Sequence, residues 1–141
     1  MFSKTCTYAI RAMLYLAAHT DEDRKMRVDE IAKELAVPKH FLAKILQQLT
    51  RYQLASSMKG PNGGFYLSES DKKASLLPVI EQIGGPQNLT SCVLGLPECS
   101  SAKPCMFHQQ AVAYRNKLLD MFGKETIGEL AERMILDDIQ F

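Results

Sequence analysis

Three of the four cysteines of this chain lie within fourteen residues of one another, where their thiols could bind a metal or undergo redox chemistry. Cys92, Cys99 and Cys105 are spaced C-x6-C-x5-C, and His108 follows three residues after the last cysteine. Soft thiolates with one imidazole suit either Zn²⁺ or an iron–sulfur cluster, although the paired C-x2-C knuckles of structural zinc are absent. The spacing favours metal ligation without choosing the metal. A metal-free disulfide switch and inert buried cysteines are the alternatives.

The segment that carries these cysteines, residues 87–105, is expected to be irregular. It is punctuated by glycine and proline and has few apolar residues that could bury a thiol, so inert burial has the weakest support. His108 is expected on the first turn of a long helix, where its ring can lean back toward the loop as a ligand. A histidine at that position can equally be a solvated or capping residue, so its role stays open.

Composition and length set the class of protein. The chain has 141 residues, of which 46% are hydrophobic and 23% charged, as in an ordinary single-domain globular protein. No apolar run approaches the roughly 20 residues that span a bilayer, and the N-terminus lacks the apolar segment of a secretory signal. We therefore expect a cytoplasmic protein with reduced cysteines. The sequence also lacks the C-x-x-C, GxGxxG and Walker motifs, so we expect that this protein is not an enzyme.

Charge is distributed unevenly along the sequence. Residues 1–66 hold ten Lys or Arg and six Asp or Glu, whereas residues 67–141 hold seven and ten. Residues 36–66 contain four basic residues and no acidic one: Lys39, Lys44, Arg51 and Lys59. Such a stretch is a candidate surface for a polyanion, and chance clustering is the alternative.

Apolar spacing predicts three helices in the first half. The first is indicated by Ala9, Ala12, Met13, Leu16 and Ala17, and the second by Val28, Ile31, Ala32 and Leu35. The second helix should stop at residues 36–38, because a residue before proline is pushed out of the helical region. A third helix over residues 39–52 should bury Phe41, Leu42, Ile45, Leu46, Leu49 and Tyr52. Its outward stripe then holds His40, Lys44, Gln47 and Arg51.

A hairpin is predicted directly after this helix-turn-helix pattern. Residues 54–59 and 65–68 are short alternating runs, separated by a loop at residues 60–64 whose glycines, proline and asparagine are typical of turns. A helix-turn-helix followed by a hairpin is the winged-helix arrangement. The acid-free stretch covers its turn, recognition helix and wing.

The second half is predicted to be helical around the cysteine loop. A short helix over residues 75–80 should end by residues 84–86, and a long helix should run over residues 106–122. A heptad seam along the long helix predicts a dimer interface at Phe107, Ala111, Tyr114, Leu118 and Met121. A capping box at Thr126 should open a last helix that buries Ile127, Leu130, Ala131, Met134 and Ile135.

The predicted architecture is mainly α with a small β-hairpin wing. Residues 1–68 form the winged helix-turn-helix region, and residues 69–141 carry the cysteine sensor loop and the dimerisation helices. We expect the two regions to make one compact domain.

At four places the sequence resembles the Rrf-two family of winged-helix transcription regulators, the group of IscR and NsrR. The resemblance covers nearly the whole chain and rests on residues 7–17, residues 37–49, the wing at residues 59–65 and the three-cysteine loop. Each segment alone is weak evidence, but the four in this order are specific.

The resemblance implies a homodimer, paired through the long helix, that binds imperfect palindromes in double-stranded DNA. It implies a [2Fe–2S] or [4Fe–4S] cluster on Cys92, Cys99 and Cys105, with His108 matching the fourth ligand of IscR-type members. Such a cluster can be missing from the purified protein. The recognition helix would enter the major groove, and the basic residue of the wing would reach the minor groove.

Three departures from the family pattern limit what can be carried over. The first cysteine spacing is six residues, where IscR-type members have five. Thr7 stands where nitric-oxide-sensing members place an acidic ligand, and the neighbouring Cys6 is expected to be buried rather than to replace it. Ala43 and Lys44 stand where IscR has two residues that read bases, so its operator sequence should not be transferred.

These observations predict a DNA-binding transcriptional regulator, acting as a repressor, controlled by an iron–sulfur cluster or a redox-sensitive cysteine loop. The alternative is a metal-free winged-helix regulator that senses through a thiol switch or a small ligand. The expected DNA-contacting residues lie on the third helix and in the wing: Lys39, His40, Lys44, Gln47, Gln48, Arg51, Lys59, Gly60 and Asn62.

Overall fold

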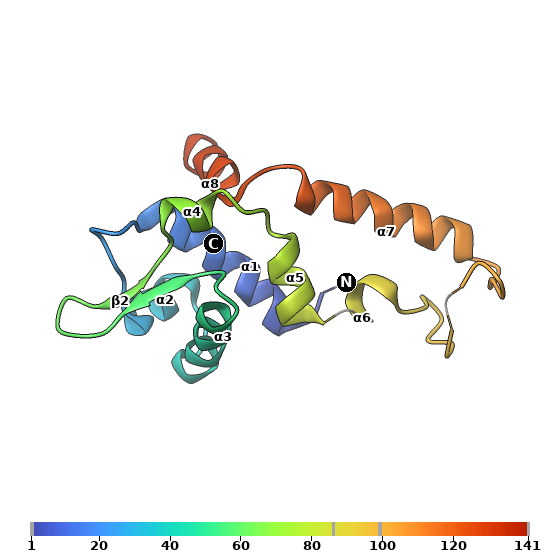
Figure 1. Ribbon diagram of the computed structural model, residues 1–141, viewed down its shortest axis with the longest axis horizontal. Helices are drawn as coiled ribbons and strands as arrows, with labels where there is room; N and C mark the ends of the chain where they lie inside the picture. The colour runs from blue at the N-terminus through green and yellow to red at the C-terminus, as the bar shows by residue number, and fades with distance from the viewer. Residues whose placement is uncertain (1, 86, 99, 141) are drawn as a thin grey trace.

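The elements follow one another as three helices, a β-hairpin and a second group of helices, which confirms the predicted mainly α fold with a small wing (Figure 1). The computed structural model describes residues 2–85, 87–98 and 100–140. In chain order the elements are α1 (Lys4–His19), α2 (Val28–Leu35), α3 (Lys39–Arg51), β1 (Ser56–Met58), β2 (Gly64–Tyr66), α4 (Glu69–Lys72), α5 (Leu77–Gly84), α6 (Gln87–Thr90), α7 (His108–Gly123) and α8 (Ile127–Leu136).

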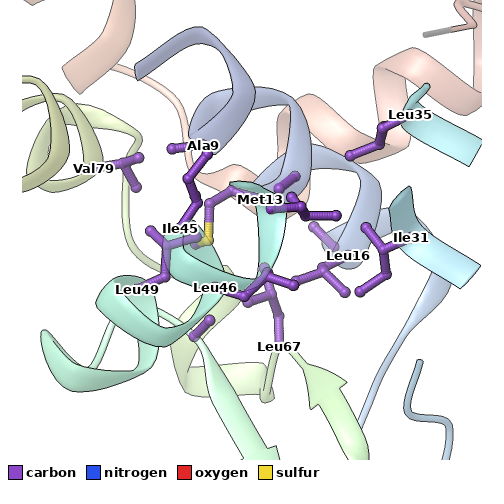
Figure 2. Close-up of a cluster of buried hydrophobic side chains, with 14 of the residues drawn as sticks. Ala9, Met13, Leu16, Ile31, Leu35, Ile45, Leu46, Leu49, Leu67 and Val79 are labelled. Atoms are coloured by element: carbon purple, nitrogen blue, oxygen red, sulfur yellow. The ribbon is translucent and has the colours of Figure 1, made fainter. Parts of the chain in front are cut away.

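The core is built around α1, which packs against α8, α5 and α3. Its buried face includes all of the residues predicted from helical spacing: Ala9, Ala12, Met13, Leu16 and Ala17. In Figure 2 this face meets side chains from α2, from α3 and from the segment after β2, such as Ile31, Leu46 and Leu67. Because protein interiors are close-packed, this shared core holds the helix-turn-helix and the hairpin in a fixed relation.

A tight turn joins α2 to α3. Ala36 adopts a left-handed backbone conformation with φ 53°, and Val37 is buried. Arg11 of α1 donates a hydrogen bond of 2.9 Å to the Leu35 carbonyl, which satisfies an acceptor at the end of α2. Pro38 then precedes the first residue of α3. The predicted end of the second helix at residues 36–38 is confirmed.

Two residues of the stripe predicted to be buried on α3 are exposed instead. The stripe is buried at Leu42, Ile45, Leu46 and Leu49. Phe41, however, is 37% exposed and Tyr52 is 45% exposed. The Phe41 ring packs edge-on against Tyr8 of α1, with 5.8 Å between the ring centroids, rather than entering the core. Tyr52 follows the last residue of α3, so helical periodicity no longer directs its side chain inward.

The wing is tied to the chain that precedes α2. The Met26 N–H donates to the Phe65 carbonyl at 3.0 Å, and the Phe65 N–H donates to the Met26 carbonyl at 2.7 Å. Gly64 was predicted to lie in the loop but belongs to β2. A Cβ at this position would lie 2.5 Å from the Met26 carbonyl oxygen, so the close backbone approach requires glycine.

Thr20 joins the end of α1 to the hairpin through a buried hydroxyl. Its Oγ1 donates to the Leu16 carbonyl at 2.6 Å and accepts the Leu67 N–H at 3.1 Å. Thr20→Val keeps the side-chain shape but leaves that buried N–H without a partner, so we expect a loss of about 1–3 kcal/mol in the free energy of unfolding. Urea unfolding would measure it. Thr20→Ser, which keeps the hydroxyl, should lose less, and equal losses for the two variants would contradict this assignment.

The last helix follows the predicted pattern except near its end. Thr126 and Glu129 form the predicted capping box, and Ile127 and Ala131 are buried. Leu130 and Met134 are partly buried, whereas Ile135 is exposed, contrary to the prediction. Ile135 lies in the last turn of α8, where the neighbouring Arg133 and Leu136 are exposed as well.

The long helix α7 projects from the body (Figure 1), and none of its residues is buried. It is anchored at its C-terminal end, where Phe122 packs edge-on against Phe2 with 5.5 Å between the ring centroids. The helix begins at His108 rather than at residue 106, because residues 105–108 form a turn closed by a hydrogen bond from the His108 N–H to the Cys105 carbonyl.

The segment predicted to be irregular, residues 87–105, contains the short helix α6, which packs against α5. In the parts of the chain that the structure covers, no helix is both long and apolar enough to cross a membrane.

Candidate functional site

The outer face of α3 presents the polar and basic side chains predicted to meet DNA. The buried leucines and isoleucine on the opposite face dock the helix against α1 and α5. All six residues singled out on this helix are exposed: Lys39, His40, Lys44, Gln47, Gln48 and Arg51. Cationic side chains suit phosphates, and amide side chains suit base edges in the major groove.

The wing places its loop beside the start of α2. The three residues predicted to contact DNA there are all exposed: Lys59, Gly60 and Asn62. The loop is closed by a hydrogen bond of 3.0 Å from the Gly63 N–H to the Gly60 carbonyl. Arg27, at the start of α2, donates a hydrogen bond of 2.9 Å from Nη2 to the Pro61 carbonyl. The wing is therefore held from its tip as well as from its base.

Arg27 and Asp29 belong to this surface, although neither was singled out in the sequence. Arg27 spans 34 residues to reach the wing. Asp29 Oδ1 lies 2.5 Å from Lys39 Nζ, and both side chains are 63% exposed. The cluster of basic residues at positions 24–27 could have pointed to Arg27 as a DNA-contacting residue. The contact of Arg27 with the wing, however, depends on the tertiary structure. Residues 36–66 contain no acidic residue, yet folding brings the Asp29 carboxylate against Lys39, the first basic residue of that stretch.

Two of the three loop cysteines meet in the structure. Cys92 is buried and Cys105 is partly buried. Hydrogen bonds from the backbone amides of Leu94 and Leu96, and smaller contributions from the Cys105 side chain and the Gly95 amide, lower the pKa of the Cys92 thiol despite the opposing effect of burial. Cys99 lies outside the described residues. The surroundings of Cys92 favour a thiolate, the form that binds metals.

Residues of α7 form hydrogen bonds with Cys105 and with Ser91, the residue before Cys92. The His108 N–H donates to the Cys105 carbonyl at 3.1 Å. Arg115, two turns further along α7, donates a hydrogen bond of 2.9 Å to the Ser91 carbonyl. The loop therefore begins and ends against the same helix. Among the described residues, which exclude Cys99, no three His, Cys, Asp or Glu side chains lie close enough together to hold a metal ion.

Cys6 is separate from this pair. It is fully buried in α1, as expected, and burial raises the pKa of its thiol. Its surroundings favour the neutral thiol rather than a ligand.

The predicted dimer seam of α7 faces solvent in the single chain. Phe107, Tyr114 and Met121 are 49%, 54% and 56% exposed. Ala111 and Leu118 are partly buried. Large apolar side chains at heptad spacing on a projecting helix are typical of an interface with another chain.

Comparisons with known proteins agree with this geometry. Residues 2–133 match the family model named Rrf2, described as an iron-dependent transcriptional regulator. A relative in Aquifex aeolicus, named as an HTH-type transcriptional regulator, is 35% identical over 92% of this chain and 90% of its own length. An rrf2-like HTH-type regulator of Rhodobacter capsulatus is 30% identical over 99% of this chain and 91% of its own length.

Among solved structures, CymR, the global cysteine regulator of B. subtilis, has a similar fold. Its TM-score is 0.75 and its identity 22%, over 94% of this chain and 97% of CymR. These proteins are regulators and not enzymes, in agreement with the expectation from sequence.

Proposed function

Because this chain belongs to the Rrf2 family of transcriptional regulators, we propose that it represses transcription by binding palindromic DNA as a homodimer, with an iron–sulfur cluster on the cysteine loop controlling its affinity. The observation that carries the DNA-binding part is the exposed polar face of α3 beside a wing held by Arg27. The observation that carries the sensing part is the meeting of Cys92 and Cys105 at the start of α7.

Each part of the DNA-facing surface has its own task in this proposal. α3 enters the major groove, where His40, Gln47 and Gln48 reach base edges. Lys44 and Arg51 on the same helix bind phosphates, which orient the protein on the duplex. The wing, with Lys59 at its loop, approaches the adjacent minor groove and sugar-phosphate backbone.

The donor set of the loop fits a thiolate-bound cluster. Backbone N–H groups of residues 94–96 surround the Cys92 sulfur, and such hydrogen bonds stabilise a ligating thiolate. Cys92, Cys99 and Cys105 would hold the cluster, and His108, which follows Cys105 by three residues, would supply the fourth ligand. When bound, an iron–sulfur cluster supplies iron that reacts with oxygen or nitric oxide.

The chain itself transmits the state of the loop. The hydrogen bonds of Arg115 with Ser91 and of His108 with Cys105 tie the loop to the first half of α7. Untying the loop frees the start of the helix that pairs the two subunits. Because the two recognition helices must match two half-sites, a change in their spacing changes affinity for the operator.

Contacts between Cys92 and Cys105 also favour a second candidate function. The two side chains are hydrogen-bonded, and the fold is similar to that of CymR, described as a global cysteine regulator. In this alternative the loop holds no metal, and oxidation of two of its thiols to a disulfide changes the shape of the loop. Iron content after anaerobic purification separates the two candidates.

DNA binding can be tested through its salt dependence. Anisotropy titrations with promoter DNA from upstream of the protein's own gene should show affinity falling steeply with salt. Lys44→Ala and Arg51→Ala should each weaken binding and reduce the slope of log K against log salt by about 1.8, because each subunit of the dimer loses one phosphate contact worth about 0.9. Lys117→Ala, on α7, is the matched control and should change neither quantity. A slope unaffected by either α3 variant would refute the proposed interface.

A further inference from the structure

A hollow of about 360 Å³ separates the wing from the starts of α2 and α3. One wall is wing backbone at Gly60, Gly63 and Gly64. The other carries three charged side chains, Arg27, Asp29 and Lys39. We call this hollow the wing pocket. Lys39 is the first residue of the recognition helix, so the wing pocket opens beside the surface proposed to face DNA.

The wall formed by the wing is open backbone at Gly63 and Gly64, flanked by Met58 and Phe65. At Gly63 a Cβ would collide with the Met58 carbonyl oxygen, and at Gly64 a Cβ would lie 2.5 Å from the Met26 carbonyl oxygen. No side chain can therefore fill the hollow from positions 63 and 64. The paired hydrogen bonds between Met26 and Phe65 keep this wall at a fixed distance from the start of α2.

Positive charge in the wing pocket is only partly neutralised. Arg27 donates to the Pro61 carbonyl, a neutral acceptor, and within the described parts of the chain it makes no ion pair. Lys39 pairs with Asp29 at 2.5 Å, but both groups are 63% exposed. Exposed ion pairs are weak, because water screens them and both side chains lose freedom. An anion that reaches Arg27 as well as Lys39 can therefore displace Asp29 from Lys39.

We propose that the wing pocket binds one backbone phosphate of DNA, and that Asp29 is an internal competitor which occupies Lys39 until that phosphate displaces it. The inference rests on the proposed DNA binding. It adds a phosphate-binding site to that proposal and a carboxylate that weakens the affinity for DNA. A backbone phosphate carries one negative charge, as the Asp29 carboxylate does, but it can accept charge-assisted hydrogen bonds from Arg27 and Lys39 together, whereas Asp29 is paired with Lys39 alone. Asp29 thus lowers affinity for any duplex, because every duplex carries the phosphate.

Removing the competitor should strengthen binding. Asp29→Asn is expected to tighten binding about tenfold at low salt, on promoter DNA and on a mixed-sequence duplex alike, because a phosphate contact carries no sequence information. The gain should disappear in the Lys39→Gln background, where there is no ammonium group to release. Glu34→Gln removes the same charge from the far end of α2, where the carboxylate is not paired with Lys39, so it should change affinity much less than Asp29→Asn does.

Arg27 provides an independent measurement. Arg27→Gln can still donate to the Pro61 carbonyl but loses the charge. It should therefore weaken binding about tenfold on both duplexes and lower the salt slope by about 1.8, with about 0.9 from each subunit of the dimer. Arg27→Lys should restore much of the slope. Thermal unfolding by circular dichroism checks that each variant is folded, and Asp29→Ser serves as a second variant if Asp29→Asn is not.

The outcomes separate this inference from the function on which it rests. An equal gain from Asp29→Asn and Glu34→Gln, or a gain that persists with Lys39→Gln, would show a general charge effect and overturn the role of Asp29. An unchanged salt slope in Arg27→Gln would overturn the phosphate site while DNA binding stands. Failure of the unaltered protein to bind either duplex would instead refute the proposed function.

Discussion

Protein made and purified without oxygen is expected to be coloured and to contain iron and sulfide, and Cys92→Ala, Cys99→Ala and Cys105→Ala should each abolish both the colour and the iron. The three thiolates lie on one short loop, and closing a loop of five or six residues costs little entropy, so all three can bind the same cluster. Because the cluster needs all three, loss of any one of them should prevent its binding. Visible absorption and iron and sulfide assays measure the result.

The fourth cysteine provides a matched control for these variants. Cys6 is fully buried in α1 and burial raises the pKa of its thiol, so Cys6→Ala should keep the colour and the iron. His108→Ala should alter the spectrum or stability of the centre without abolishing it, because all three thiolates remain and an outside ligand can take the place of the imidazole. A colourless anaerobic preparation with no iron would refute the proposed cluster and favour the alternative in which the loop thiols form a disulfide. Tightly bound stoichiometric zinc would indicate a structural site instead.

Leu118→Glu and Met121→Glu should each convert the protein to monomers and remove its binding to palindromic DNA. Both residues lie on the seam of α7, and Met121 is 56% exposed in the single chain, so a glutamate there costs the folded monomer little. In a dimer the same glutamate is buried against the partner helix without a counter-charge, a change that typically costs several kcal/mol. Light scattering at micromolar concentration measures the change in mass.

A variant on the opposite side of the same helix controls for charge. Asn116→Glu adds the same charge at an exposed position outside the seam, and the dimer should persist. Since monomers can meet only one half-site at a time, both seam variants should retain weak, non-palindromic binding. An unaltered protein that is already monomeric would contradict the interface, and palindrome recognition with it.

Much of the fold could be predicted from the sequence, because short-range patterns specify it. The buried face of α1, the turn before Pro38 and the capping box at Thr126 each depend on neighbouring residues, and the structure confirms all three. The burial errors fall in the first or last turn of a helix or directly after it. Phe41, Tyr52 and Ile135 each continue an apolar period into an exposed position. A periodic pattern carries no information about how far the neighbouring elements cover the helix.

For the candidate site too, the sequence was enough to identify residues close together in the chain, whereas contacts between distant residues required the structure. The order of residues was enough to identify the exposed stripe of α3 and the loop cysteines, because each set lies on one helix or within one short segment. The structure alone joins Arg27 to Pro61, Asp29 to Lys39 and Arg115 to Ser91. These contacts link different elements, so they exist only once the core around Met13 has set the distances between helices. Helical and turn propensities are local free energies that a sequence displays directly, whereas the pairing of distant charges depends on the packing of the whole chain.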